Sequence, residues 1–455
     1  MKLFIYSLFL LPFSLFAETG DIEGTVRHAE TKEGIAAVEV YVQEIGKLLT
    51  SDRFGNFKLS KLNYGQYTFQ IFAPNYNSFT QQIQLDSPSE QIEILLTPLS
   101  TDLTTVNVSA KNEWSTFRHL RSVEGTAIYA AKKSEVIELD GLVANLATNN
   151  AREVYRAVAG LNVWENDGAG LQLAIGARGL DPNRTSNFNT RQNGFDISAD
   201  ALGYPESYYT PPTQALQRIE IVRGAASLQY GTQFGGLLNF KLKEGTPDKP
   251  LEFISENTIG SFGLFNSFNS LGGTKGKLNY YAFYQRKQGD GWRENSGFHQ
   301  NTAYLDVHYD FTPKLKVGLE LTHMNYLAQQ AGGLTDAQFR FEDPRQSNRA
   351  RNWFDVDWKL AALHIDYKIS EHTQLNFRNF LLDARRQALG ELGPINRPEP
   401  MRERDLIAGN YQNMGSEGRL MHRYKIAGNI THFLVGYRYY RGYSTNEQGD
   451  ASAGS

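Results

Sequence analysis

Long segments in the second half of the chain alternate strictly between apolar and polar residues. Residues 301–311, NTAYLDVHYDF, put Ala, Leu, Val and Tyr on one face of an extended chain and Asp, His and Asp on the other. The stretches KVGLELTH at 316–323 and AALHIDYKI at 361–369 repeat this pattern. Because successive side chains of a β-strand point to opposite faces, these segments predict strands with one apolar and one charged face.

The connections between these segments favour a transmembrane barrel over a soluble sandwich. TKGK, DFTPK, ISEHT, AGN and the first connection near 261–264 are short, whereas those at 288–299, 328–353 and 386–415 are long and fall on one side. Transmembrane barrels have short turns at one rim and long loops at the other, and no such rule binds a secreted sandwich. We predict about nine strands in residues 247–455, near 251–260, 264–273, 277–287, 300–311, 314–327, 354–369, 372–385, 416–427 and 430–442.

The first half of the chain predicts two further folded regions and a linker. Residues 18–99 hold short alternating strands cut by turns, such as VEVYV at 38–42, and predict a small β-sandwich. Residues 100–112 are polar and β-branched, and predict an extended linker. Residues 113–246 mix strand and helix signals and predict a compact α+β unit. The fold class is therefore mainly β.

Helix signals in the α+β region lie between residues 142 and 160. Apolar residues recur near helical spacing at Leu142, Leu146, Val154 and Val158. Asn149 and Asn150 can cap a second helix that ends at Gly160.

The N-terminal residues predict export. Residues 1–17 have one lysine, an apolar run of about 14 residues and then a small residue, which is the pattern of a secretory signal peptide. This run is shorter than the roughly 20 residues that a membrane-spanning helix needs, and no later stretch reaches that length. A buried N-terminal strand or helix is the less favoured alternative.

Composition and motifs exclude several classes of function. The net charge of −3 and the lack of basic runs argue against nucleic-acid binding, and the absence of cysteine excludes disulfides and thiolate chemistry. The chain has no G-x-S-x-G, HExxH or P-loop motif, so we expect no catalytic residue, metal site or cofactor. His308, His323 and His364 lie in predicted strands and are expected to be lumen-facing polar residues.

The glycine-rich stretch IEIVRGAASLQYGTQFGGLLNFKLK at 219–243 could also be a phosphate-binding loop. No Lys-Ser/Thr follows the glycines, and the next predicted element is a strand, which offers no helix N-terminus to an anion. These glycines therefore predict tight turns and close packing.

Two parts of the chain resemble known families. GTVRHAETKEGIAAVEVYVQE at 24–44 and the strands at 50–76 resemble the carboxypeptidase-regulatory-like domain, an accessory sandwich of exported proteins. Residues 171–241 closely resemble the plug domain of TonB-dependent outer-membrane receptors, with RG at 178–179, RIEIVRG at 218–224, YG at 230–231 and GGLLNF at 235–240. YPESYYTPP at 204–212 further resembles the ferric dicitrate branch of that family.

The resemblance implies an outer-membrane active transporter, not an enzyme, that imports ferric citrate or a related ferric siderophore. It implies a barrel of about 22 strands with a plugged lumen, of which this chain would hold the first part. Its partners would be TonB with the inner-membrane energising complex, the ferric ligand and outer-membrane lipid, and the N-terminal sandwich would be periplasmic. Import of haem, cobalamin or a glycan by the same fold, or a secreted β-rich adhesin, are the alternatives.

The resemblance also implies roles for individual residues. The TonB box, which TonB captures as an added strand, would be Leu103, Thr104, Thr105, Val106, Asn107, Val108 and Ser109. Polar anchors of the plug would be Arg178, Gly179, Glu220, Arg223 and Gly224. Candidates for binding an anionic ferric citrate complex are Arg184 and Arg191 on the plug loop 181–196, and Arg345, Arg349 and Arg351 in DPRQSNRARNWF. Alternatively, these arginines pair with Glu342, Asp343 or lipopolysaccharide phosphates.

Overall fold

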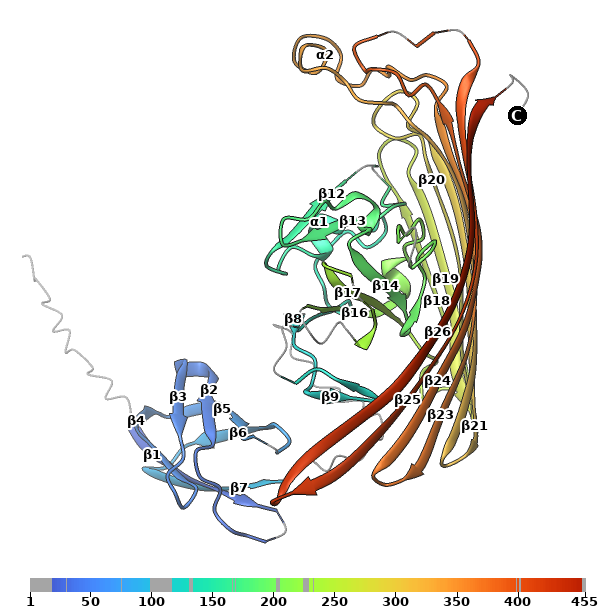
Figure 1. Cartoon of the computed structure of the whole chain (residues 1–455). Coiled ribbons are helices and arrows are strands. Elements are labelled where there is room, and N and C mark those ends of the chain that lie inside the picture. The colour runs from blue at the N-terminus through green and yellow to red at the C-terminus, as the bar shows by residue number, and fades with distance from the viewer. Residues whose placement is uncertain are drawn as a thin grey trace, which may run out of the picture. The chain divides into compact units, whose positions relative to one another are not determined.

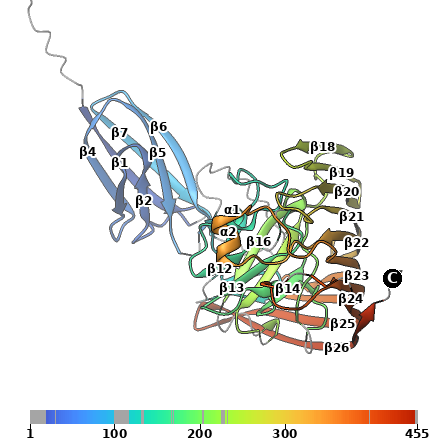
Figure 2. The same ribbon diagram turned by 90° about the horizontal axis from the view of Figure 1, so that it is seen from above.

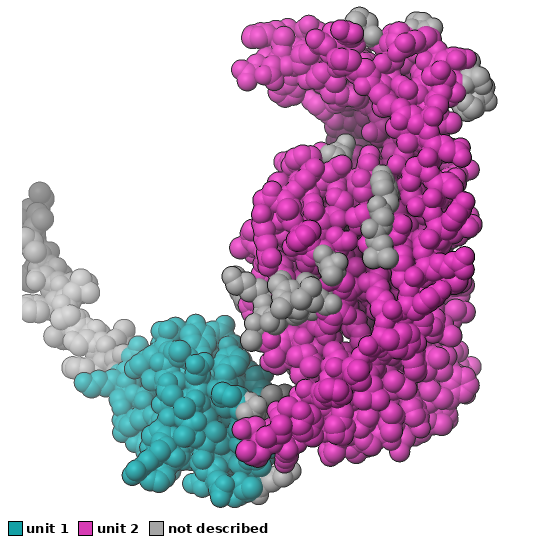
Figure 3. Space-filling model, in the orientation of Figure 1, with its two compact units in different colours: residues 1–105 teal, residues 106–455 magenta. Residues whose placement is uncertain are grey.

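The computed structural model divides the chain into two compact units, residues 1–105 and 106–455 (Figure 3). It describes residues 19–29, 31–74, 76–98, 117–130, 134–165, 167, 169–201, 205–223, 229–231, 233–397, 399–400 and 402–451. The predicted signal peptide, the predicted TonB box at 103–109 and Gly224 lie outside the described residues.

The first unit is the predicted β-sandwich. One sheet has the order β4-β1-β7, with Asn56–Asn63, Thr19–His28 and Ser89–Leu96. The other has the order β3-β2-β5-β6, with Lys47–Thr50, Glu39–Val42, Gly65–Phe72 and Phe79–Leu85, and the 3-10 turn η1 (Gln43–Ile45) follows β2. Alternate residues of both sheets form one buried core, which includes Val26, Val40 and Phe69.

The second unit contains an inner domain, residues 117–246, built on a six-stranded sheet. The sheet order is β15-β14-β17-β16-β11-β8, with Phe195–Asp196, Phe188–Gln192, Gly236–Leu242, Leu216–Val222, Ser134–Glu138 and Phe117–Arg118. Two short pairs accompany it, β9 (Val123–Glu124) with β10 (Ala127–Ile128), and β12 (Leu161–Trp164) with β13 (Ala174–Ala177). The turns η2 (Asn183–Thr185) and η3 (Thr213–Ala215) are 3-10 helices. The two strands predicted within 219–243 are thus β16 and β17, which pair antiparallel.

The helix prediction for this domain is only partly correct. The helix α1 spans Ala151–Val154, and the Asn150 side chain caps it by accepting a hydrogen bond from the Glu153 N–H. The helix ends six residues before Gly160, and residues 142–148 form turns instead of helix. Leu142 is buried and Leu146 packs, partly buried, against the same core, so the spacing of these two residues reflects packing and not a helical backbone.

The rest of the second unit is a wall of nine antiparallel strands, each paired with the next along the chain (Figures 1 and 2). The strands are β18 (Glu252–Ile259), β19 (Phe265–Lys275), β20 (Leu278–Gly289), β21 (Phe298–Thr312), β22 (Leu315–Gln329), β23 (Trp353–Ser370), β24 (Thr373–Gly390), β25 (Arg404–Ile426) and β26 (Asn429–Ala451). The short helix α2 (Asp336–Phe341) lies in the connection between β22 and β23. The structure therefore has a strand in each of the nine predicted segments.

The predicted bounds of the last two strands are wrong. β25 begins at Arg404 instead of 416, and β26 continues to Ala451 instead of 442. Residues 404–415 are rich in polar residues and glycine, which reads as a loop, but the backbone pairs in register with β24 on one side and β26 on the other. Long-range pairing that the local sequence does not encode therefore sets these ends.

The two faces of the wall differ as the alternation predicts. Leu305, Leu319 and Leu381 on the convex face are 38%, 45% and 57% exposed, whereas Glu320 and Trp358 on the concave face are buried beneath the inner domain. The prediction that His323 faces the lumen is wrong. His323 lies on the convex face, and its ring nitrogen lies 2.9 Å from the Asp357 carboxylate. Its position is odd-numbered in β22, as are those of the exposed leucines, so strand parity puts it outside the lumen. No helix among the described residues is long and apolar enough to cross a membrane.

Candidate functional site

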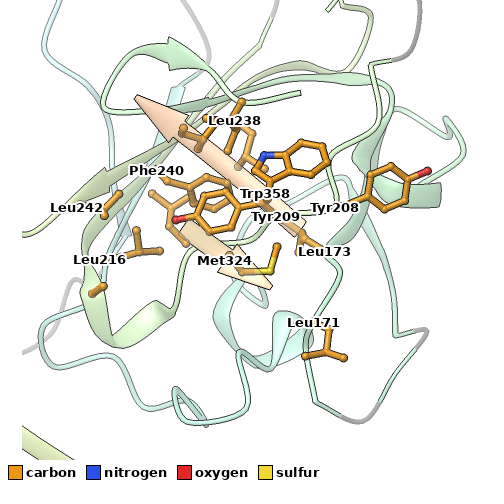
Figure 4. Packing of buried hydrophobic residues seen from close by; sticks show 14 of the residues in the cluster. Leu171, Leu173, Tyr208, Tyr209, Leu216, Leu238, Phe240, Leu242, Met324 and Trp358 are labelled. Atoms are coloured by element: carbon orange, nitrogen blue, oxygen red, sulfur yellow. The ribbon is translucent and has the colours of Figure 1, made fainter. Parts of the chain in front are cut away.

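The inner domain packs against the concave face of the wall through an apolar core that both contribute to. Leu216, Leu238 and Phe240 of the inner domain lie near Met324 and Trp358 of the wall (Figure 4). The rings of Tyr208 and Trp358 are 5.9 Å apart, and those of Phe195 and Phe380 stack at 6.0 Å. The sequence analysis named only polar anchors, and the structure shows that aromatic packing holds the domain as well.

A buried ion pair is the strongest polar contact between the two. Arg191 of β14 is fully buried, and its Nη1 and Nη2 donate to the two oxygens of Glu417 on β25 at 2.8 and 2.7 Å. Its remaining hydrogen bonds go to the Asn189 side chain and to the carbonyls of Gly194 and Tyr230, at 2.6, 2.6 and 2.9 Å. Burial alone lowers the pKa of Arg191, but the Glu417 carboxylate outweighs it, so the net shift is upward.

A second polar contact joins the end of β14 and the turn that follows it to the middle of the wall. The Gln192 and Asn193 amides donate to the Glu320 carboxylate at 2.5 and 2.9 Å. Glu320 is buried and also lies 3.3 Å from the His364 ring nitrogen. The carboxylate is thus compensated by the two amide donors.

A third group of contacts fixes the opposite side of the inner domain. Gln214, in η3, bonds Asn266 at 2.8 Å and also bonds Glu256. The fully buried Lys287 of β20 reaches inward and donates to the Ala169 carbonyl at 2.5 Å. At the last strand of the wall, β26, the Tyr440 hydroxyl donates a hydrogen bond to the Asp200 carboxylate at 2.9 Å. Polar anchors therefore surround the apolar core.

Comparisons with known proteins decide what the inner domain is. The family model described as TonB-dependent Receptor Plug Domain matches residues 130–237, and the CarboxypepD_reg-like domain matches residues 22–108. The chain contains a TonB-dependent receptor plug domain. The match of the first domain runs into the predicted linker 100–112 and overlaps the predicted TonB box.

Solved structures of similar fold contain the arrangement of the plug domain and the wall. The ferric citrate transporter FecA, unliganded, matches with 24% identity and a TM-score of 0.63, over 72% of this chain and 50% of that one. The ferric-catecholate import receptor Fiu from E. coli K12 matches with 14% identity and a TM-score of 0.57, over 70% and 48%. BauA, the ferric preacinetobactin receptor of Acinetobacter baumannii, matches with 12% identity and a TM-score of 0.56, over 70% and 48%. The chain spans about half the length of these structures.

The four predicted plug anchors that the structure describes make their contacts within the plug domain. Arg178 and Gly179 are exposed in a turn, where both have a positive φ. Glu220 accepts hydrogen bonds from Arg218 and Asn239, and Arg223 pairs with Glu135 and donates to the Ala159 carbonyl at 2.8 Å. Glu220 and Arg223 therefore join the strands of the plug domain to one another.

Apart from Arg191, which the sequence analysis assigned to the ligand, the anchors to the wall are residues that the sequence analysis did not name. They are mostly amides and aromatics of the plug domain, whose chemical type alone does not distinguish them from ordinary surface residues. The signal that could have found them lies in the wall: Glu320 and Glu417 occupy inward positions of otherwise alternating strands. A carboxylate at such a position needs a donor from the plug domain.

The arginines predicted to bind ligand all have intramolecular partners. Arg191 lies in strand β14 and not in an apical loop, and its full burial leaves no surface for a ligand. Arg184 pairs with Glu206 at 2.9 Å, and Arg345 pairs with Asp343 at 3.1 Å. Arg345 therefore follows the alternative that we stated, pairing with a neighbouring acid.

Arg349 and Arg351 tie the long loops of the wall together. Arg349 is 3% exposed and donates to the Gly393 and Pro394 carbonyls at 2.7 and 3.0 Å. Arg351 pairs with Glu399 at 2.9 Å. Each bond joins the loop after β22 to the loop after β24, so both arginines shape the loop surface. Among the residues that the structure describes, no group of His, Asp and Glu is arranged to hold a metal ion.

Proposed function

We propose that this protein is a TonB-dependent active transporter of the outer membrane that imports ferric citrate or a related ferric siderophore. The observation that carries the proposal is a plug domain that packs on the concave face of an antiparallel wall through an apolar core and buried polar contacts, while leucines are exposed on the convex face. Such a wall suits a lipid-embedded barrel with a plugged lumen. No catalytic role is proposed.

The nature of the cargo is supported by two similarities. FecA, a ferric citrate transporter, shares 24% identity with this chain, against 14% for Fiu and 12% for BauA. The stretch YPESYYTPP, which resembles the ferric dicitrate branch, contributes Tyr208 and Tyr209 to the core between plug domain and wall.

The plug–wall contacts suit a plug that moves and returns. In the proposed cycle the ligand binds from outside, TonB captures residues 103–109 as an added strand, and the proton motive force of the inner membrane displaces the plug domain. Amide and carboxylate groups that separate from each other can bond water and then pair again, so polar anchors make displacement reversible. The sandwich of residues 18–99 would lie on the periplasmic side with the box.

Uptake of radioactive ferric citrate tests this function. The complete gene is expressed in a Gram-negative host that lacks its own ferric citrate receptor, with and without TonB. We expect uptake that needs TonB and that stops with a proton uncoupler. Deleting residues 103–109 should abolish uptake, whereas deleting the equally long segment 110–116 tests whether linker length alone matters. Binding without uptake in any strain, or uptake that does not require TonB, would contradict the proposal.

A competition experiment tests the cargo separately. Haem, cobalamin and oligosaccharides are added in excess over labelled ferric citrate. We expect only ferric complexes of carboxylate or siderophore ligands to compete. Energised uptake of one of the other compounds, with none of ferric citrate, would retain the transporter and reject its proposed cargo.

A further inference from the structure

We propose that Gln229 and Tyr230 form a clasp that couples residues 127–129 to the wall. These three residues directly precede the stretch that matches the plug-domain model, and they are called the entry segment below. A pull on the entry segment would then reach the wall directly through these two residues. The clasp itself is inferred from the contacts of the plug domain; its use in transport rests on the proposed function.

The entry segment is bonded to both residues of the clasp. The Gln229 side chain accepts a hydrogen bond from the Ile128 N–H at 3.1 Å and donates to the Ile128 carbonyl at 2.8 Å. The hydroxyl oxygens of Tyr129 and Tyr230 lie 2.5 Å apart. An amide side chain that satisfies both backbone groups of one residue imitates strand pairing, so the segment is held along its backbone and at one side chain.

A small apolar core reinforces this contact. Ala127, Tyr129, Val222, Tyr230 and Leu237 are at most 7% exposed and form a cluster of their own, separate from the large core between plug domain and wall. Two of its members belong to the entry segment, and Tyr230 belongs to the clasp. The entry segment and the clasp therefore have a hydrophobic reason to stay together.

The backbone carbonyls of the same two residues are held by arginines of the wall. Arg438 of β26 donates to the Tyr230 carbonyl at 2.7 Å, and Arg419 of β25 donates to the Gln229 carbonyl at 3.2 Å. The Arg419 guanidinium also lies 4.2 Å from the centre of the Tyr230 ring, within the range of a cation–π contact. Side chains of the clasp thus face the entry segment, while its carbonyls face the wall.

The clasp is joined to the buried ion pair as well. Arg191 donates to the Tyr230 carbonyl at 2.9 Å, and Arg419 and Arg438 lie within 3.4 Å of the Glu417 carboxylate. Opening of the clasp therefore removes partners from the charged group that anchors the plug domain. Because coupling between two contacts is reciprocal, loosening the wall side should also loosen the entry segment.

Thiol labelling of the entry segment measures this coupling. Residues 1–455 contain no cysteine, so an Ala127→Cys substitution, at a site 5% exposed, provides a buried reporter thiol in the protein expressed from its complete gene. The rate of its reaction with a maleimide in outer-membrane vesicles reports how often the segment opens. Gln229→Leu removes the two hydrogen bonds of the side-chain amide to Ile128, and Tyr129→Phe removes the hydroxyl that faces Tyr230. Arg419→Met removes the wall donor to the Gln229 carbonyl.

We expect Tyr129→Phe to accelerate labelling by roughly two- to tenfold, the change that the loss of a neutral hydrogen bond produces. Gln229→Leu, which loses two hydrogen bonds, and Arg419→Met, which loses a charged donor, should accelerate it at least as much. The effects of Gln229→Leu and Arg419→Met should be non-additive, because both act on one clasp. The control Tyr155→Phe changes another buried tyrosine of the plug domain outside the clasp and should leave the rate unchanged. Equal rates in all variants, or strictly additive effects, would overturn the proposal.

The labelling assay needs neither ligand nor TonB, so it separates the clasp from the transport function. If Gln229→Leu protein does not reach the membrane, Tyr129→Phe retains the ring packing and tests the same contact. If the substitutions alter labelling but the parent protein shows no energised uptake, the clasp is supported and the proposed transport function is wrong. Normal uptake with unaltered labelling would retain the transporter and reject the clasp.

Discussion

Glu417→Ala is the substitution that tests most directly how the plug domain is held. It leaves the guanidinium of Arg191, which is fully buried, without its charged partner. Removing one member of a buried ion pair costs about 3–5 kcal/mol, because the remaining charge has lost its compensation. Arg191 keeps its bonds to Asn189, Gly194 and Tyr230, so the lower end of this range, about 3 kcal/mol, is expected.

Removing both charges should cost much less than removing one. In the double variant Arg191→Met/Glu417→Met both members of the pair become apolar side chains of similar length. Arg438 keeps its pair with Asp196 at 3.2 Å, and Arg419 keeps its hydrogen bond to the Gln229 carbonyl at 3.2 Å. Replacement of a buried pair by apolar residues is often close to neutral, so we expect a loss of free energy of unfolding within about 1–2 kcal/mol of the parent. The double variant should therefore be more stable than Glu417→Ala.

Urea unfolding in detergent micelles, followed by tryptophan fluorescence, measures these differences. Trp358 is fully buried beside Tyr208 of the plug domain, so its emission changes when the domain leaves the wall. The control is Asp343→Ala, which breaks the exposed Asp343–Arg345 pair and should leave the midpoint unchanged. The reasoning is refuted if Glu417→Ala behaves like this control, or if the double variant is no more stable than Glu417→Ala.

Three further outcomes are expected. Trp358→Ala removes a fully buried ring from the plug–wall core and should lower the free energy of unfolding by about 3–5 kcal/mol. Because this variant lacks the fluorescent reporter, its urea unfolding is followed by circular dichroism, and a loss below about 1 kcal/mol would mean that the core is not formed. Gly24→Ala would place a Cβ atom 2.1 Å from a ring carbon of Phe57, so the free energy of unfolding of the sandwich should fall by about 1–3 kcal/mol. Hydrogen exchange of the sandwich strands in the full chain measures this loss, and unchanged exchange would contradict the packing. The Asn56 backbone N–H holds the pKa of Asp52 below its usual 3.8, so folding favours the ionised carboxylate. The contribution of this carboxylate to sandwich stability is therefore complete above about pH 4 and falls as the pH drops through the lowered pKa. Asp52→Asn should remove this acid-dependent part of the exchange profile, and a profile identical to that of the parent would rule it out.

Local sequence was sufficient where one face of a strand had to be apolar. Most wall strands alternate over long stretches, and a one-residue error of register would exchange their two faces, so the facing of their side chains follows from the pattern. The far ends of β25 and β26 do not follow from it. His323 shows that the same parity rule corrects a placement made from chemical type alone. Asn150 was likewise recognisable as a helix cap, because capping depends on residues only three positions apart.

Residue roles at the interface could not be obtained in this way. Arg191 reads as an available cation in the sequence, and only its contact with Glu417, 226 residues later in the chain, shows that it is buried and neutralised. Gln229 and Tyr230 lie in a stretch whose glycines suggested a turn, and their partners come from residues 128–129 and from β25 and β26.

The sequence by itself determined the strand pattern, the order of the regions and the resemblance to a plug domain, because these depend on short-range periodicity and contiguous motifs. The tertiary structure alone decided which polar groups hold the plug domain. Their partners come from distant strands, and whether a charge is a ligand site or an anchor depends on its burial and on the group opposite it.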